Sequence, residues 1–147
     1  MIKFYEGHGR TLAKVISWRV LLTISHILNG FFATGNWVVG FQIAGTAAII
    51  NSFLFWIHER GWNIFQWNRN VSQNLIFSEG NTRSLSKIIT WRILITGSNF
   101  LIPFILTGSL GSAVLFAGLA TVINMFLFWS HERIWNFLKW KKTVKES

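Results

Sequence analysis

The sequence contains no cysteine, a single proline and only five acidic residues among 147. Without cysteine there is no disulfide, no thiolate nucleophile and no cysteine-ligated zinc or iron–sulfur centre. Charged residues make up 13% of the chain, whereas hydrophobic residues make up 51% and include nine Trp and fourteen Phe. Soluble domains of this size are far less apolar. The composition therefore predicts a protein of the lipid bilayer.

The chain consists of two copies of one unit. Residues 10–67 align without a gap with residues 83–140, at a constant offset of 73. Both copies begin with Arg-x-Leu-x-Lys-x-x-x-Trp-Arg and end with Asn-x-Phe-Leu-Phe-Trp-x-His-Glu-Arg-x-Trp-Asn. A repeat that keeps its polar residues as well as its apolar ones predicts a pseudo-two-fold object. The remaining residues form an N-terminal segment (1–9), a linker (68–82) and a basic tail (141–147).

Each copy contains two apolar runs, at 20–34 and 37–57 in the first and at 93–107 and 110–130 in the second. A span needs roughly 20 residues to cross a hydrocarbon core about 30 Å thick. The turns between paired runs are only a few residues long and contain Gly, which favours tight helical hairpins. We predict an all-α integral membrane fold with four transmembrane helices. Two tandem hairpins would be related by pseudo-two-fold symmetry about the membrane normal. Pro103 is expected to kink or thin the third span near its far end.

All fourteen Lys and Arg residues and all five Glu residues lie on one side of the two predicted turns. By the positive-inside rule, both termini and the linker are expected in the cytoplasm, in a multi-pass protein of the plasma (inner) membrane. A net charge of +9 also occurs in nucleic-acid-binding proteins. Here the cations flank apolar spans and Trp residues, so we expect anionic lipid headgroups as partners and no nucleic acid.

Arg19 and Arg92 are expected inside the first and third spans. Counting 1.5 Å per residue from the turns places Arg19 level with Asn51 and Arg92 level with Asn124, so we predict contacts within each hairpin. The same helical faces continue with Thr23 and His26 in the first copy and with Thr96 and Asn99 in the second. Two interpretations stay open: a buried polar latch in each hairpin, or a path for a polar solute.

Each copy ends with His-Glu-Arg-x-Trp at the level where the span meets the cytoplasmic surface. The same counting pairs Glu59 with Lys14 or Arg10, and Glu132 with Lys87 or Arg83. We predict an interfacial ion-pair and headgroup cluster that comprises Arg10, Lys14, His58, Glu59, Arg60, Trp62, Arg83, Lys87, His131, Glu132, Arg133 and Trp135. Paired histidines can also ligate haem or a metal. The Glu and Arg that follow each histidine favour the ion-pair cluster, and neither a cofactor nor a metal is expected.

These signatures resemble those of prokaryotic predicted membrane proteins grouped as a domain of unknown function. The unit of that family is a two-span hairpin that opens with Arg-Ser-x-x-Lys-x-x-Ser/Thr-Trp-Arg and ends with His-Glu-Arg-x-Trp. Residues 83–92 fit the opening closely, and residues 10–19 fit it with Thr11 in the serine position. Residues 58–62 and 131–135 supply the endings. The resemblance implies an integral membrane location and a four-span tandem form, but no activity.

Two function classes remain. The sequence shows no phosphate-binding loop, dinucleotide fingerprint or nucleophile with its base, so no catalytic residues and no enzymatic activity are expected. We favour an accessory or scaffold subunit whose basic, Trp-rich cytoplasmic girdle binds lipids, because each costly polar residue has a predicted internal partner. The alternative is a channel or transporter for a small anion or polar solute, with Arg19/Asn51 and Arg92/Asn124 lining the path. A homo-oligomer or a larger membrane complex is left open.

Overall fold

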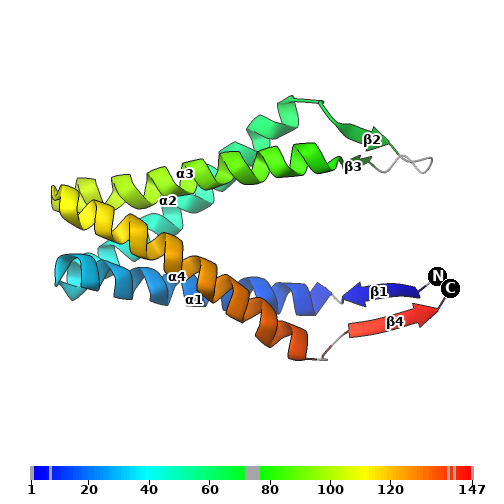
Figure 1. Cartoon of the computed structure of the whole chain (residues 1–147), viewed down its shortest axis with the longest axis horizontal. Coiled ribbons are helices and arrows are strands. Elements are labelled where there is room, and N and C mark those ends of the chain that lie inside the picture. Colours follow the sequence, from blue (N-terminus) through cyan, green and yellow to red (C-terminus); the bar gives the residue numbers. More distant parts are fainter. Residues whose placement is uncertain (1, 7, 72–76, 139, 141, 147) are drawn as a thin grey trace.

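Four long α-helices dominate the computed structural model, which describes residues 2–6, 8–71, 77–138, 140 and 142–146 (Figure 1). Each helix is long and apolar enough to cross a membrane. The predicted all-α membrane fold is therefore confirmed. The helices are α1 (His8–Thr34), α2 (Trp37–Ile64), α3 (Asn81–Thr107) and α4 (Leu110–Phe137).

Two tight turns close the hairpins at one end of the bundle, which we call the tip end. Gly35 and Gly108 adopt the left-handed conformation, with φ of 71° and 66°, which glycine accepts without strain. Asn36 then caps α2, because its side chain accepts from the backbone N–H of Val38 at 2.8 Å. Ser109 caps α4 in the same way. The predicted hairpins are thus built from left-handed glycines followed by N-capping side chains.

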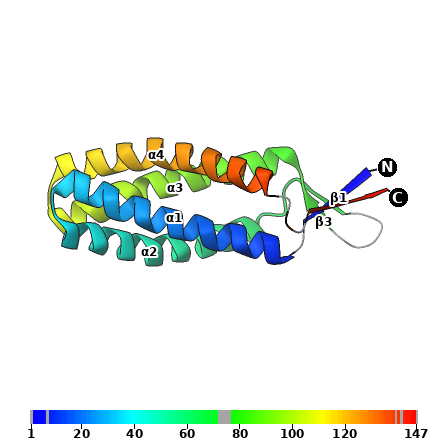
Figure 2. The ribbon, with the colours of Figure 1, turned by 90° about the horizontal axis from the view of Figure 1, so that it is seen from below.

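The helices exchange neighbours along the bundle. At the tip end each helix lies beside its hairpin partner, whereas at the opposite end α2 lies beside α3 and α4 lies beside α1 (Figure 1). We call this opposite end the charged end, since both chain termini and the linker lie there (Figures 1 and 2). The α1–α4 pair and the α2–α3 pair separate toward it. At the charged end, residues at the same depth along the bundle consequently contact a helix of the other hairpin rather than a helix of their own hairpin.

The buried core is small and consists largely of compact side chains. It contains Ile43, Ala47, Ile102, Phe116 and Ala120. Gly30 and Gly40 bring α1 and α2 into backbone contact near the tip end, as small residues do at membrane helix interfaces. Most large apolar side chains point outward instead, as expected for helices whose surroundings are lipid. At Pro103, which is buried, α3 continues without a break to Thr107.

Two short antiparallel ribbons extend the bundle at the charged end. β1 (Ile2–Glu6) pairs with β4 (Lys142–Glu146), and β2 (Arg69–Val71) pairs with β3 (Phe77–Glu79). These strands fall in the N-terminal segment, the linker and the basic tail, where the sequence predicted no strand. Each ribbon continues one of the two helix pairs, α1–α4 or α2–α3 (Figure 1).

Candidate functional site

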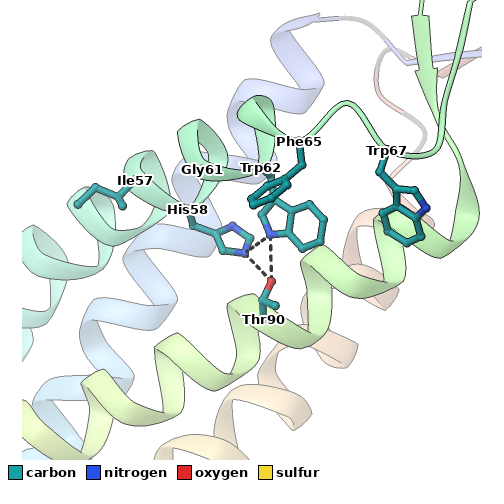
Figure 3. Close-up of a pocket in the computed structure, with 7 residues that line it drawn as sticks. All are labelled: Ile57, His58, Gly61, Trp62, Phe65, Trp67 and Thr90. Atoms are coloured by element: carbon teal, nitrogen blue, oxygen red, sulfur yellow. Dashed lines mark hydrogen bonds between the residues drawn. The ribbon is translucent and has the colours of Figure 1, made fainter.

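The α2–α3 pair holds a hydrogen-bonded triad at the charged end, made of His58, Trp62 and Thr90 (Figure 3). His58 Nε2 lies 2.8 Å from Thr90 Oγ1, and the Trp62 indole N–H donates to both atoms at 3.1 Å. The Thr90 hydroxyl in turn donates to the backbone carbonyl of Ser86 at 2.9 Å. Since an indole N–H only donates, Trp62 is the donor to both the His58 nitrogen and the Thr90 oxygen.

The α1–α4 pair repeats this triad with Ser17, His131 and Trp135. Ser17 Oγ lies 2.8 Å from His131 Nε2, and the Trp135 indole donates to these two atoms at 3.2 and 3.0 Å. Ser17 and Thr90 occupy equivalent positions of the two copies, directly before the Trp-Arg signature. The Ser/Thr of that signature therefore holds the His and Trp of the opposite hairpin.

A buried arginine caps the last turn of the neighbouring helix in each pair. Arg83, which is fully buried, donates to the carbonyls of Phe65 at 2.7 Å and Trp67 at 2.9 Å, and also to that of Trp62. Its guanidinium lies 5.4 Å from the centre of the Trp62 ring. The last carbonyls of a helix lack intrahelical partners and carry partial negative charge. The Arg83 guanidinium supplies both hydrogen-bond donors and a positive charge to these carbonyls at the end of α2.

Arg10 does the same for α4. It is fully buried and donates to the carbonyls of Leu138 at 2.7 Å and Trp140 at 2.8 Å, and to that of Trp135. Its guanidinium lies 5.3 Å from the centre of the Trp135 ring. The first arginine of each repeat is thus a structural cap for the other hairpin.

The predicted ion pairs form with exchanged partners. Lys87 Nζ lies 2.9 Å from Glu59 Oε2, and Lys14 Nζ lies 3.4 Å from Glu132 Oε1. The prediction that Glu59 pairs with Lys14 or Arg10, and Glu132 with Lys87 or Arg83, was wrong. The prediction placed the lysines and glutamates at the correct depth along the bundle. It paired them within each hairpin, whereas at this end α1 lies beside α4 and α3 lies beside α2. Both ion pairs are partly exposed, so each contributes modestly to stability.

Two further arginines of the predicted cluster lie on its outer surface. The Arg60 guanidinium lies 5.6 Å from the centre of the Trp56 ring, and that of Arg133 lies 5.4 Å from the centre of the Trp129 ring. All four side chains are exposed. We call these two exposed cation–π pairs the outer arginine pairs, in contrast to the buried Arg10 and Arg83.

The deep arginines do not form the predicted latch. Arg19 and Arg92 are both exposed, and within the described part of the chain neither donates a hydrogen bond to Asn51 or Asn124. Instead Asn51 accepts from Ser98 at 2.6 Å and Asn124 accepts from Ser25 at 3.4 Å. Both bonds cross between hairpins. The asparagines therefore join α2 to α3 and α4 to α1, as the triads do.

The predicted polar residues of the second copy do share a hollow. A cavity of about 320 Å³ lies between α3 and α4. It is lined by Arg92, Ile95, Thr96, Asn99, Ala120, Thr121, Asn124 and Met125. Asn99 is buried, and its Oδ1 has no hydrogen-bond partner among the described residues. This hollow brings Arg92, Thr96, Asn99 and Asn124 together in one lining.

The first copy differs at the matching positions. Thr23 is exposed and donates to the carbonyl of Arg19 at 2.9 Å. His26 is buried, with its ring 5.6 Å from that of Phe116. Its Nε2 also lacks a partner among the described residues. The larger imidazole packs against an aromatic ring in the position where the second copy has the shorter Asn99.

The predicted site did not include the hydroxyl residues that complete these contacts. Ser17 and Thr90 are part of the repeated Ser/Thr-Trp-Arg signature, which was the available signal. Ser25 and Ser98 also occupy equivalent positions of the two copies. The buried Asn29, whose amide donates to Ser25 at 3.3 Å, has Ile102 as its counterpart and gave no repeat signal.

These features define a class: a duplicated four-span membrane protein whose two hairpins are joined by symmetric polar contacts at one end. The chain belongs to the family described as predicted membrane protein (DUF2061), which matches residues 12–63 and 85–136. The two matches fall on the two hairpins. No curated protein and no solved structure matches the chain.

Proposed function

We propose that this protein is a non-enzymatic accessory or scaffold subunit of the inner membrane, with its charged end in the cytoplasm, where it binds anionic phospholipid headgroups. The observation that carries this proposal is the contrast between two sets of arginines. The guanidinium groups of Arg10 and Arg83 are hydrogen-bonded to backbone carbonyls inside the protein. The outer arginine pairs, Arg60/Trp56 and Arg133/Trp129, remain exposed at equivalent points of both copies.

Exposed arginine beside exposed tryptophan suits the headgroup layer. Tryptophan rings settle at the membrane interface, and the guanidinium fork matches phosphate geometry. The net charge of +9 adds general attraction to an anionic leaflet. The positive-inside rule supports the cytoplasmic orientation, since every Lys and Arg lies on the charged side of the turns.

The test compares two double variants that remove the same charge. Arg60→Gln with Arg133→Gln removes the outer arginines, whereas Lys142→Gln with Lys145→Gln removes two cations of strand β4. Each protein is reconstituted in vesicles containing equal phosphatidylcholine and phosphatidylglycerol, and lipid enrichment around it is measured by energy transfer from its Trp residues to labelled lipids. We expect the arginine variant to lose preference for the anionic lipid by roughly tenfold and the lysine variant to lose much less. Equal losses, or no preference in the parent, would contradict the proposal.

A second candidate function is supported by the hollow at Asn99. Its lining combines an arginine, two asparagines and two threonines, and the buried Oδ1 of Asn99 has no partner among the residues that the structure describes. This lining suits a small polar or anionic solute. The test is solute and anion flux into liposomes for the parent, Asn99→Leu and Arg92→Gln, with Arg19→Gln as the matched variant of the other hairpin. Flux that falls with Asn99→Leu and Arg92→Gln but not with Arg19→Gln would favour conduction. Absence of flux in the parent would contradict conduction, and the accessory role would then be the proposal that stands.

A further inference from the structure

A second hollow lies at the charged end of the α2–α3 pair, beside the His58 triad (Figure 3). It has a volume of about 590 Å³, within the range of about 300–1,000 Å³ that small-molecule sites occupy. Its walls are mainly apolar and aromatic. They are formed by Ile57, His58, Gly61, Trp62, Phe65, Trp67 and Thr90.

One side of this hollow is open because the two copies differ in one residue there. A Cβ placed on Gly61 would have no atom within 4 Å, so the space beside this residue is open. The equivalent residue of α4 is Ile134. The His, both Trp residues and the hydroxyl residue of the hollow have direct counterparts in the second copy, as His131, Trp135, Trp140 and Ser17. A branched side chain therefore stands in the second copy where the first has empty space.

The depth of the hollow decides what can fill it. Gly61 lies about 26 residues beyond the turn at Gly35, roughly 39 Å along the helix at 1.5 Å per residue. The hydrocarbon core is about 30 Å thick, and the headgroup regions extend it to about 40–45 Å. Gly61 consequently lies among hydrated headgroups, where an empty aromatic hollow is unfavourable. An apolar group attached to a polar headgroup satisfies both the hollow and its surroundings.

We infer that this hollow binds an acyl chain of one anionic phospholipid, with the lipid phosphate beside Arg60. Arg60 does not line the hollow, but it precedes Gly61 in α2, is exposed and lies over Trp56, so its guanidinium is accessible to a phosphate outside the hollow. Glu59 is already paired with Lys87, which removes its carboxylate as a repelling charge. The inference rests on the proposed lipid-binding function and adds to it an acyl-chain site at the α2–α3 pair, where Gly61 leaves the space open.

The experiment uses the asymmetry of the repeat. The parent, Gly61→Ile and Ile134→Gly are extracted in mild detergent from membranes that contain phosphatidylglycerol, and retained lipid is counted by native mass spectrometry. We expect one retained phospholipid for the parent and at least a tenfold loss of occupancy for Gly61→Ile, because the side chain fills the hollow. Ile134→Gly should keep this lipid and gain a second. Gly61→Ala, which adds one carbon without a clash, should reduce retention by less.

Controls separate this inference from the proposal on which it rests. Thermal unfolding of each variant verifies that Gly61→Ile folds, as expected for a site where an added Cβ meets nothing. If Gly61→Ile retains the lipid as the parent does, the acyl-chain site is wrong. If no lipid is retained while vesicles still show enrichment that depends on Arg60 and Arg133, the inference fails and the proposed function stands. A change of oligomeric state in Gly61→Ile without any lipid loss would assign the hollow to a protein interface and overturn the inference.

Discussion

The fully buried arginines are the most costly residues of the molecule and also among the best satisfied. Arg10 and Arg83 each place a guanidinium at the carboxyl end of a helix from the other hairpin. There the charge meets several carbonyl oxygens and the face of a tryptophan. Arginine suits this role better than lysine, because its planar fork reaches several acceptors and its charge is only weakly hydrated. In both copies, therefore, this arginine joins the two hairpins by capping a helix end.

Replacing a capping arginine should weaken the fold strongly. In Arg83→Gln the carbonyls of Phe65 and Trp67 lose charged donors inside the protein. We expect the free energy of unfolding to fall by about 2–4 kcal/mol. The measurement is reversible unfolding by SDS titration in mixed micelles. Arg60→Gln, which removes an exposed arginine, should change it by less than about 0.5 kcal/mol. Similar losses for both variants would show that burial does not distinguish their roles.

The hydroxyl group of Thr90 can be tested separately from its methyl group, since the equivalent triad already has a serine, Ser17, at this position. Ser17 accepts from Trp135 as Thr90 accepts from Trp62. Thr90→Ser should therefore leave the free energy of unfolding nearly unchanged. Thr90→Val should lower it by about 1–2 kcal/mol, because two ring nitrogens lose their shared partner. The same micelle titration measures both. A loss in Thr90→Ser as large as in Thr90→Val would assign the effect to packing rather than to the hydroxyl.

Within each element, the helices and turns follow directly from the sequence, whereas the strands do not. Long apolar runs predict the spans, and a glycine between them predicts each turn, because both signals are local. Strands β1 and β4 are five residues each and come from opposite ends of the chain. Isolated two-stranded ribbons have little intrinsic stability and no local signature. Their pairing follows from the proximity of α1 and α4, which the sequence did not reveal.

The contact between α1 and α2 depends on two glycines that the second copy lacks. A Cβ on Gly40 would lie 2.7 Å from the carbonyl oxygen of Ile27, and one on Gly30 would lie 2.7 Å from the Cα of Gly40. The counterparts in the second copy are Ala113 and Pro103. The two hairpins therefore pack differently near their tips, although the triads and arginine caps at their charged ends are equivalent.

Gly40→Ala should push α1 and α2 apart. The obstruction is backbone, which cannot move aside as a flexible side chain would, so we expect a loss of about 1–3 kcal/mol in the free energy of unfolding. The control is Gly45→Ala in the same helix, where an added Cβ meets nothing within 4 Å. That variant should be neutral or slightly stabilising, since alanine favours helix. The hypothesis of close backbone packing fails if the two alanine variants unfold alike.

At the scale of the whole molecule, depth counting could not predict the exchange of partners between the hairpins. Counting along each helix placed the lysines level with the glutamates, as the ion pairs show. It placed the asparagines level with Arg19 and Arg92, whereas their observed partners Ser25 and Ser98 lie six residues nearer the tips. Because the chain is a tandem repeat, every level contains two equivalent candidates, Glu59 and Glu132 among them. Depth alone does not distinguish the hairpin partner from the neighbour of the other hairpin. The choice depends on how far the hairpins cross, which only the assembled bundle shows.

Cross-linking tests this exchange directly, because the natural chain contains no cysteine. Glu59→Cys with Lys87→Cys replaces an ion pair whose charged atoms are 2.9 Å apart, and Lys14→Cys with Glu132→Cys replaces the other, at 3.4 Å. A short bifunctional thiol reagent should link both pairs in membranes, as detected by mass spectrometry of the linked peptides. Lys14→Cys with Glu59→Cys joins positions of one hairpin that lie level but on separated helix ends, and should not react. A molecule whose hairpins stay parallel throughout would give the reverse result, with the link between positions 14 and 59 alone.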